Sequence, residues 1–261
     1  MKKFLPIVFL FLVSALLLCG AELRIADAVP GGDAPVRQLA LREAFAGRQQ
    51  IQYSRETADD AFSGLSGGKF DLVVAELPAR PEKFAGKWRV YAVDSLVFYV
   101  NVANTLTGAK SSQLRDIFTQ KQPNWQDYSF LSTRIQRYGV KAGKPGAAYM
   151  ERFLFRGSAL ADSVRKFGST AEVLAMTGAD PDAIGFGVYA PSAPAQVKLL
   201  AVDGVEPNMK SVAETTYPLA VKRAVFTSAE PSAETRRFLE EMDKADFRDF
   251  VLQAELLPVE P

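Results

Sequence analysis

Histidine is absent from this 261-residue sequence, and Cys19 is its only cysteine. Ser-His-Asp and Cys-His nucleophilic arrangements are therefore impossible, and so are zinc sites that use histidine or paired cysteines. The sequence also has no G-x-S-x-G or Walker A motif, and no S-x-x-K placed before a helix. We therefore expect no catalytic residues, no metal site and no cofactor, and we do not expect an enzyme.

Charge of one sign is not in excess either. The formal net charge is +1, and removal of Lys2 and Lys3 would leave 29 basic against 30 acidic residues. A polybasic surface for nucleic acid is therefore not expected. Any selectivity for an anion must come from the local geometry of a site.

The first 21 residues have the pattern of a secretory signal peptide. Lys2 and Lys3 precede an apolar run, and small residues end at Ala21. We expect cleavage after Ala21 and a periplasmic or otherwise exported protein. The alternative is a lipid-anchored Cys19, although Leu18 is large for a lipobox. The exported chain then has no cysteine pair, so a hydrophobic core of sufficient size must hold it.

The rest of the chain alternates apolar strand-like runs with helical patterns, which predicts an α/β fold. The expected strands are 22–28, 50–54, 70–75, 91–102, 135–138, 183–189, 197–202 and 218–227. The expected helices are 36–46, 57–65, 113–118, 146–155, 169–176 and one that opens at Pro231 and Ser232. Asp59 and Asp60 are interpreted as a solvated helix surface rather than a metal site.

Five segments together resemble a known family. YAVDSLVFYVNVAN starts at Tyr91 and QLRDIFTQKQPNW at Gln113, and DAIGFGVYA, VKLLAVDGVEPN and YPLAVKRAVFT follow between Asp182 and Thr227. Their order and spacing are similar to those of the phosphate-type substrate-binding proteins of bacterial ABC transporters. The resemblance covers most of residues 70–240.

The resemblance implies a two-lobed, periplasmic-binding-protein-like (flytrap) fold, in which each lobe is a sheet flanked by helices. The expected organisation is a signal peptide at 1–21, a first lobe of 22–102 plus 215–261, and a second lobe of 103–214. Asn101–Asn104 is expected to be one crossing between the lobes. The return crossing is expected near 203–217.

The resemblance also implies a site for a small anionic solute in the cleft between the lobes. Arg137 and the loop to Gly146 match the family's anion loop, with Lys144-Pro145-Gly146 in place of Ser-Gly-Thr. Glu76 matches an acidic site residue, and Ala28 lies in the first anion-binding loop. The ligand-binding residues implied are Ala28, Glu76, Arg137, Lys144, Gly146 and Ala147.

Two functions remain open at this point. The first is an exported solute-binding protein, expected to be a monomer, that delivers phosphate or another small oxyanion to an ABC permease. The second is a diverged binding module with a signalling or assembly role. The expected hydroxyl side chains are missing from the anion loops, and each neutral hydrogen bond contributes about 0.5–1.5 kcal/mol. We therefore expect phosphate itself to bind weakly or not at all.

Overall fold

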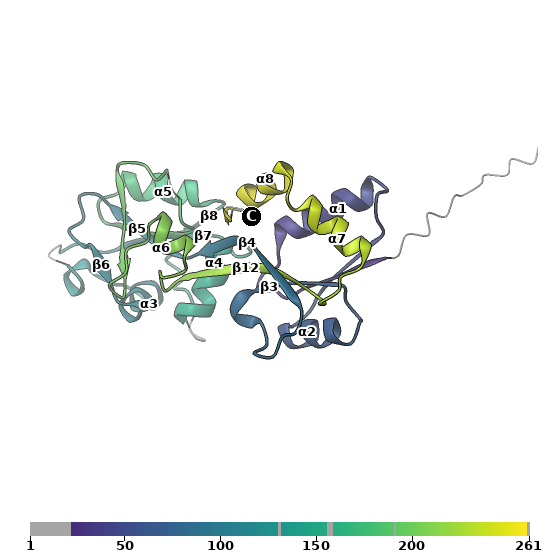
Figure 1. Cartoon of the computed structure of the whole chain (residues 1–261). Helices are drawn as coiled ribbons and strands as arrows, with labels where there is room; N and C mark the ends of the chain where they lie inside the picture. Colours follow the sequence, from purple (N-terminus) through teal and green to yellow (C-terminus); the bar gives the residue numbers. More distant parts are fainter. Residues whose placement is uncertain (1–21, 130–131, 156–158, 191, 260–261) are drawn as a thin grey trace, which may run out of the picture.

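The computed structural model describes residues 22–129, 132–155, 159–190 and 192–259. The expected signal peptide and Cys19 lie outside these ranges. The chain forms two larger sheets and one small one, and helices flank the larger sheets (Figure 1). The α/β architecture expected from the sequence is confirmed.

The first sheet has six strands in the order β13-β4-β12-β3-β1-β2. β1, β2 and β3 are parallel, whereas β12 runs antiparallel to both β3 and β4. Its strands are β1 (Leu23–Asp27), β2 (Ile51–Arg55), β3 (Leu72–Glu76), β4 (Lys87–Ser95), β12 (Ala220–Thr227) and β13 (Leu257–Pro258). Its helices are α1 (Ala34–Phe45), α2 (Ala58–Ser66), α7 (Ala233–Glu241) and α8 (Ala245–Gln253), with the 3₁₀ turn η1 (Leu77–Ala79).

Both faces of the first sheet are buried, because helices cover each of them (Figure 1). Successive side chains of a strand point to opposite faces. Leu72 and Val74 therefore pack with α1, α7 and α8, whereas Val73 packs with α2. This explains the continuous apolar run at β3, which is typical of a strand buried on both sides.

The second sheet has five strands in the order β10-β5-β9-β7-β8, and β6 pairs with β11 separately. The strands are β5 (Val97–Asn101), β6 (Gly108–Ala109), β7 (Gln136–Val140), β8 (Arg165–Phe167), β9 (Ala183–Gly187), β10 (Val197–Leu199) and β11 (Ala201–Val202). The helices are α3 (Ser111–Thr119), α4 (Pro145–Tyr149), α5 (Thr170–Ala179) and α6 (Met209–Ala213), with the 3₁₀ turn η2 (Trp125–Asp127) and the π-helix η3 (Met150–Phe155).

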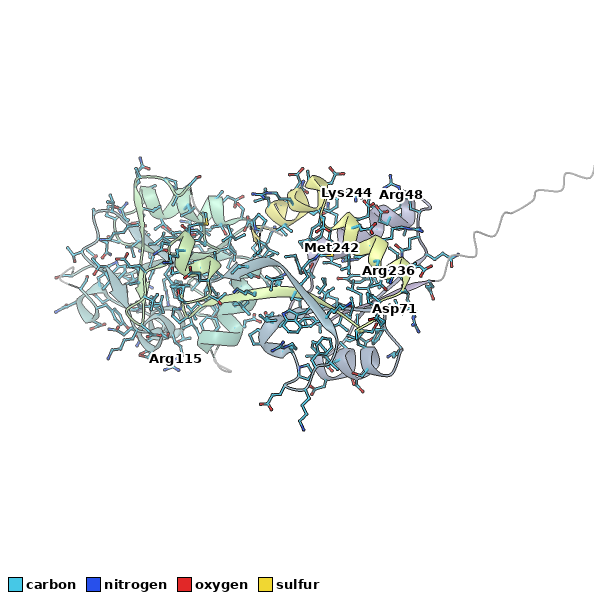
Figure 2. The ribbon with its side chains drawn as sticks, in the orientation of Figure 1. Arg48, Asp71, Arg115, Arg236, Met242 and Lys244 are labelled. Atoms are coloured by element: carbon cyan, nitrogen blue, oxygen red, sulfur yellow. The ribbon has the colours of Figure 1, made fainter. Side chains whose placement is uncertain are left out.

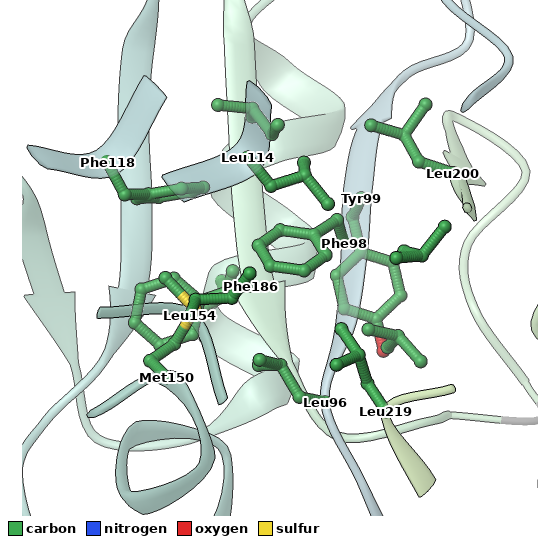
Figure 3. Close-up of a cluster of buried hydrophobic side chains, with 14 of the residues drawn as sticks. Leu96, Phe98, Tyr99, Leu114, Phe118, Met150, Leu154, Phe186, Leu200 and Leu219 are labelled. Carbon is green, nitrogen blue, oxygen red and sulfur yellow. The ribbon is translucent and has the colours of Figure 1, made fainter. Parts of the chain in front are cut away.

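The core of the second sheet is aromatic. Phe118 packs against Phe98 and Phe186, with ring centroids 5.7 and 5.3 Å apart. Leu114 and Leu154 complete the cluster from the helical side (Figure 3). Contacts between offset or edge-to-face rings add to the stabilisation from buried area. The first sheet therefore has one hydrophobic core on each face, and a third core, which also reaches Val93 and Val221 of the first sheet, holds the second sheet.

Three sequence predictions need correction. The expected strand 91–102 is two strands in different sheets, because the chain leaves the first sheet at Leu96. The sheet therefore changes earlier than the crossing expected at Asn101–Asn104. The expected strand 197–202 is likewise β10 and β11, in two sheets. The expected helix 146–155 is a short α-helix followed by π-helix, and α8 and β13 were not foreseen.

Candidate functional site

A cavity of about 510 Å³ lies between elements of the first sheet and the loop before α4. Four of its lining residues are cationic and three are acidic. The residues that line it are Asp27, Pro30, Gly31, Gly32, Asp33, Ala34, Arg37, Tyr53, Arg55, Gly143, Lys144, Arg223, Gln253, Ala254 and Glu255. Most come from the carboxyl ends of β1 and β2, from the start of α1 and from the end of α8. Ligand sites of α/β proteins commonly lie at the carboxyl ends of parallel strands.

Arg223 is the buried cation of this cavity. It lies in β12, and its guanidinium forms ion pairs with Asp33 at 3.1 Å and with Asp94 of β4. The side chains of all three residues are 5% exposed or less. Burial opposes ionisation of Arg223, but Asp94 and Asp33 hold its pKa well above the ordinary arginine value. The floor of the cavity is thus an ion-pair network of the protein itself.

Asp27 organises the loop between β1 and α1. Its carboxylate accepts hydrogen bonds from the Val29 amide at 2.9 Å, the Asp33 amide at 2.8 Å and the Tyr53 hydroxyl at 2.9 Å. Arg55 approaches the same carboxylate at 3.5 Å. Every buried carboxylate oxygen needs such donors. Asp27 is therefore occupied by the protein's own groups.

Asp33 is the N-cap of α1. Its Oδ1 accepts from the Val36 amide at 2.9 Å, which is the usual cap bond, and Pro35 follows in the first turn. Its Oδ2 accepts from the Tyr91 hydroxyl and from Arg223. The N-cap thereby fixes the start of α1 against β4 and β12. It also places Arg37, one turn further along α1, at the exposed edge of the cavity.

Gly32 has a backbone conformation that favours glycine, and it packs against Arg55. Its φ is +97°, and a Cβ there would lie 2.0 Å from an Arg55 guanidinium nitrogen. Arg55 donates to the Val29 carbonyl at 2.9 Å across this glycine. The loop therefore closes over the arginine, and a larger residue at this position would displace it.

The carboxyl group of Asp94 has a raised pKa in the folded protein. Burial raises its pKa to about 6, Arg223 opposes the shift, and the nearby Glu76 adds to it. The unfolded pKa is about 3.9, so the folded state binds a proton more tightly. The stability that this group contributes is therefore lost as pH rises from about 4 to about 6.

We predict a measurable effect of this shift on unfolding. On going from pH 7 to pH 5, wild type should gain about 1 kcal/mol of unfolding free energy relative to Asp94→Asn. Urea denaturation at pH 5, 6 and 7 on both proteins measures this difference. Parallel pH profiles of the two proteins would contradict the raised pKa.

Lys144 and Glu255 line the side of the cavity that meets the second sheet. Lys144 is the N-cap of α4 and is exposed. Glu255 follows α8 and accepts hydrogen bonds from the Thr170 hydroxyl at 3.0 Å and the Thr170 amide at 3.4 Å, at the start of α5. Glu255 thus connects the end of the chain to the second sheet.

Arg137, the residue expected to grip the anion, does not line the cavity. It is 3% exposed, and its guanidinium donates to the carbonyls of Ile117 at 2.8 Å, Gln120 at 2.7 Å and Lys121 at 3.3 Å, and to the Ser163 hydroxyl. Burial, and then the nearby Arg134, lower its pKa from the ordinary arginine value. Arg137 is thus positioned to cap the carboxyl end of α3.

The other expected site residues are dispersed. Lys144 lines the cavity, whereas Ala28, Glu76, Gly146 and Ala147 do not. The Ala28 amide is bonded to the Val74 carbonyl at 2.8 Å, and Ala147 lines a separate, mostly apolar cavity. Glu76 accepts from the Tyr149 hydroxyl at 3.4 Å. Gly146 packs against β9, where an added Cβ would come within 3.1 Å of the Gly187 Cα.

Sequence reasoning missed Arg37, Arg55, Arg223 and the acidic residues of the floor. Asp94 and Arg223 each interrupt an apolar strand, which is a signal for a buried ion pair. Asp33 precedes a proline in the first turn, which signals an N-cap. Nothing in the sequence distinguishes Arg37 from a surface arginine. Asp59 and Asp60 are exposed and do not line the cavity, as expected for a solvated helix start.

The described ranges also bear on metal binding and on membrane insertion. No group of three or more acidic or cysteine side chains there has an arrangement that could hold a metal ion. None of the helices described is long and apolar enough to cross a membrane.

Comparison with known proteins places this geometry in context. No protein-family model matches the chain. The phosphate-binding protein PstS of Bacillus subtilis (strain 168) is 23% identical over 163 residues, which is 62% of this chain and 53% of that protein. The matched segment thus spans about half the length of the Bacillus protein.

Solved structures match over almost the whole chain. A possible phosphate binding protein from Planctomyces limnophilus DSM 3776 superposes with a TM-score of 0.76 at 16% identity, covering 92% of this chain and 93% of that one. PstS from Borrelia burgdorferi gives 0.67 at 15% identity, with coverages of 93% and 100%. A phosphate transport receptor from Vibrio cholerae gives 0.60 at 16% identity, with coverages of 92% and 100%.

The chain has the fold of the phosphate-type substrate-binding proteins. The resemblance predicted from the sequence segments is confirmed at the level of the fold. The side chain of Arg137, however, donates hydrogen bonds to carbonyls at the carboxyl end of α3.

Proposed function

We propose that this protein is an exported solute-binding protein that holds an anionic solute in the cavity between its two sheets and delivers it to an ABC permease. One observation carries the proposal. All three lining carboxylates accept hydrogen bonds or ion pairs from the protein, whereas Arg37 and Lys144 have no side-chain partner among the described residues. The charged side chains that remain available to a ligand are therefore cationic.

The arrangement of the two sheets supports a binding protein that closes on its solute. We propose two lobes, one around each larger sheet, with the cavity between them. Arg37 belongs to the first lobe and Lys144 to the second. An anion that contacts both would stabilise the closed arrangement over an open one. The similar proteins are named as a phosphate-binding protein and a phosphate transport receptor, which is consistent with an anionic ligand.

A binding role is proposed in preference to catalysis. Among the lining residues that the structure describes, there is no serine, threonine or cysteine beside a general base. The tyrosine of the cavity, Tyr53, has its pKa raised by burial and by the neighbouring Asp27 and Asp33, so its hydroxyl stays protonated at neutral pH.

The test is the loss of an anion contact at Lys144. Lys144→Gln should weaken the binding of an anion by about 1.5–3 kcal/mol, the range for hydrogen bonds to charged groups. Isothermal titration with inorganic phosphate, sulfate, acetate and gluconate measures the effect. Lys141→Gln is the matched control, because Lys141 is exposed in the same loop but does not line the cavity. Equal losses in both variants, or none in Lys144→Gln, would contradict the proposal.

The diverged binding module remains the second candidate, because a specific observation favours it. The floor of the cavity is filled by the protein's own ion pairs, and Arg137 is directed to α3. If no anion binds in the titrations, a role in signalling or assembly becomes the better proposal.

A further inference from the structure

The cavity also indicates the chemical class of the solute. We propose that the ligand is a hydroxylated organic anion, with its carboxylate or phosphate at the rim of the cavity and its hydroxyl groups towards the floor. This inference rests on the proposed function. It differs from the expectation of a small inorganic oxyanion, and three observations lead to it.

The first observation is size. The cavity volume is about 510 Å³, and one water takes about 30 Å³ in the liquid. The cavity therefore has room for about seventeen waters, whereas a tetrahedral oxyanion has five heavy atoms. Cavities of about 300–1,000 Å³ are typical of sites for organic ligands. A phosphate ion alone would leave most of this volume filled with water.

The second observation is the charge of the floor. Asp27, Asp33 and Asp94 are each about 1% exposed, and only Arg55 and Arg223 face them with positive charge. Asp94 does not itself line the cavity, so an anion at the floor would meet Asp27 and Asp33, whose counter-charges Arg55 and Arg223 are already in ion pairs. Its favourable position is the rim, where Arg37 and Lys144 are both exposed.

The third observation is the direction of the hydrogen bonds at the floor. The Tyr53 hydroxyl donates to Asp27 at 2.9 Å, with the Asp33 carbonyl oxygen at 3.2 Å, so its proton is committed and its oxygen can only accept. Carboxylates are acceptors as well. The floor therefore offers the Tyr53 oxygen as an acceptor and the unpartnered Arg223 Nε–H as a donor, and a hydroxyl group can bond to either because it both donates and accepts.

Gln253 adds a contact suited to a hydroxylated body. It ends α8, lines the cavity and is exposed, and its side-chain amide has no hydrogen-bond partner among the described residues. An amide both donates and accepts, so it can bind a hydroxyl group in either sense. The cavity thus has cationic donors at the rim, an acceptor and a donor at the floor and an amide at one wall.

The experiment compares matched pairs of probes by isothermal titration. One pair is glucose 6-phosphate and inorganic phosphate, and the other is gluconate and acetate. We expect the hydroxylated member of each pair to bind at least about ten-fold more tightly, a difference of about 1.4 kcal/mol. Gln253→Ala should reduce that ratio several-fold. Gln38→Ala should keep it, because Gln38 is exposed on α1 and does not line the cavity.

The outcomes separate the two proposals. If inorganic phosphate binds as tightly as glucose 6-phosphate and Lys144→Gln weakens both, the inference is wrong and the proposed function stands. If no probe binds to the wild-type protein, both are wrong. Thermal melting of each variant confirms that these surface substitutions leave the fold intact.

Discussion

Replacing Arg223 by alanine is expected to lower the unfolding free energy by about 3–5 kcal/mol, because Asp33 and Asp94 would remain buried without their counter-charge. Both acidic side chains are fully buried, and both contact the Arg223 guanidinium. Loss of one member of a buried ion pair leaves a charge that water cannot reach. Urea denaturation at pH 7 measures the loss.

Arg236→Ala is the control for this prediction. Arg236 lies on the surface of α7 (Figure 2), and within the described residues its side chain donates only to the Pro231 carbonyl, so a change within about 0.5 kcal/mol is expected. A second variant separates charge from packing. Arg223→Met in an Asp94→Asn background should be less destabilised than the sum of the two single variants, because one of the two opposing charges is gone. Additive losses would show that packing, not charge, dominates.

Arg137→Ala is expected to lower the unfolding free energy by about 2–4 kcal/mol and to leave anion binding unchanged. The guanidinium is the donor to three carbonyls at the end of α3, and hydrogen bonds to charged groups are the stronger kind. Its removal leaves acceptors buried without donors. Thermal and urea denaturation give the first quantity, and titration with gluconate and inorganic phosphate gives the second.

The control lies in the helix that Arg137 caps. Arg115 of α3 is partly exposed, and its ion pair with Asp116 is long, at 3.9 Å (Figure 2). Arg115→Ala should therefore change stability by less than about 1 kcal/mol. If Arg137→Ala instead abolishes anion binding and keeps its stability, the position implied by the family resemblance is functional after all.

The fold could be predicted from the sequence because its signals are local or sequential. β3 is a run of apolar residues, most of α1 has apolar residues at helical spacing, and the family segments occur in order. The exchange of sheets at Leu96 could not be predicted in the same way. No glycine or proline stands between Asp94 and Val97, and the pair Asp94-Ser95 alone is a weak turn signal within a long apolar run.

The site was less predictable, because it depends on the direction of side chains and on partners distant in sequence. Arg137 occupies the expected strand, but its guanidinium donates to carbonyls at the end of α3 and does not line the cavity. Arg223 contacts Asp33 from 190 positions away. The position of Lys144 at the cavity was predictable, because it depends on the backbone of the loop before α4 and not on the direction of a side chain.

The two chain crossings between the sheets lie side by side. The Leu96 amide donates to the Leu219 carbonyl at 2.8 Å, and Ser95 pairs with Ala220 in the next register position. Two separate linkers would let the halves twist, slide and bend independently. A hydrogen-bonded ribbon couples the two crossings mechanically, so the halves retain essentially one rotation about a shared pivot. Under the proposed function, solute exchange would then follow a single angular coordinate, and a disulfide that fixes this ribbon would slow the exchange.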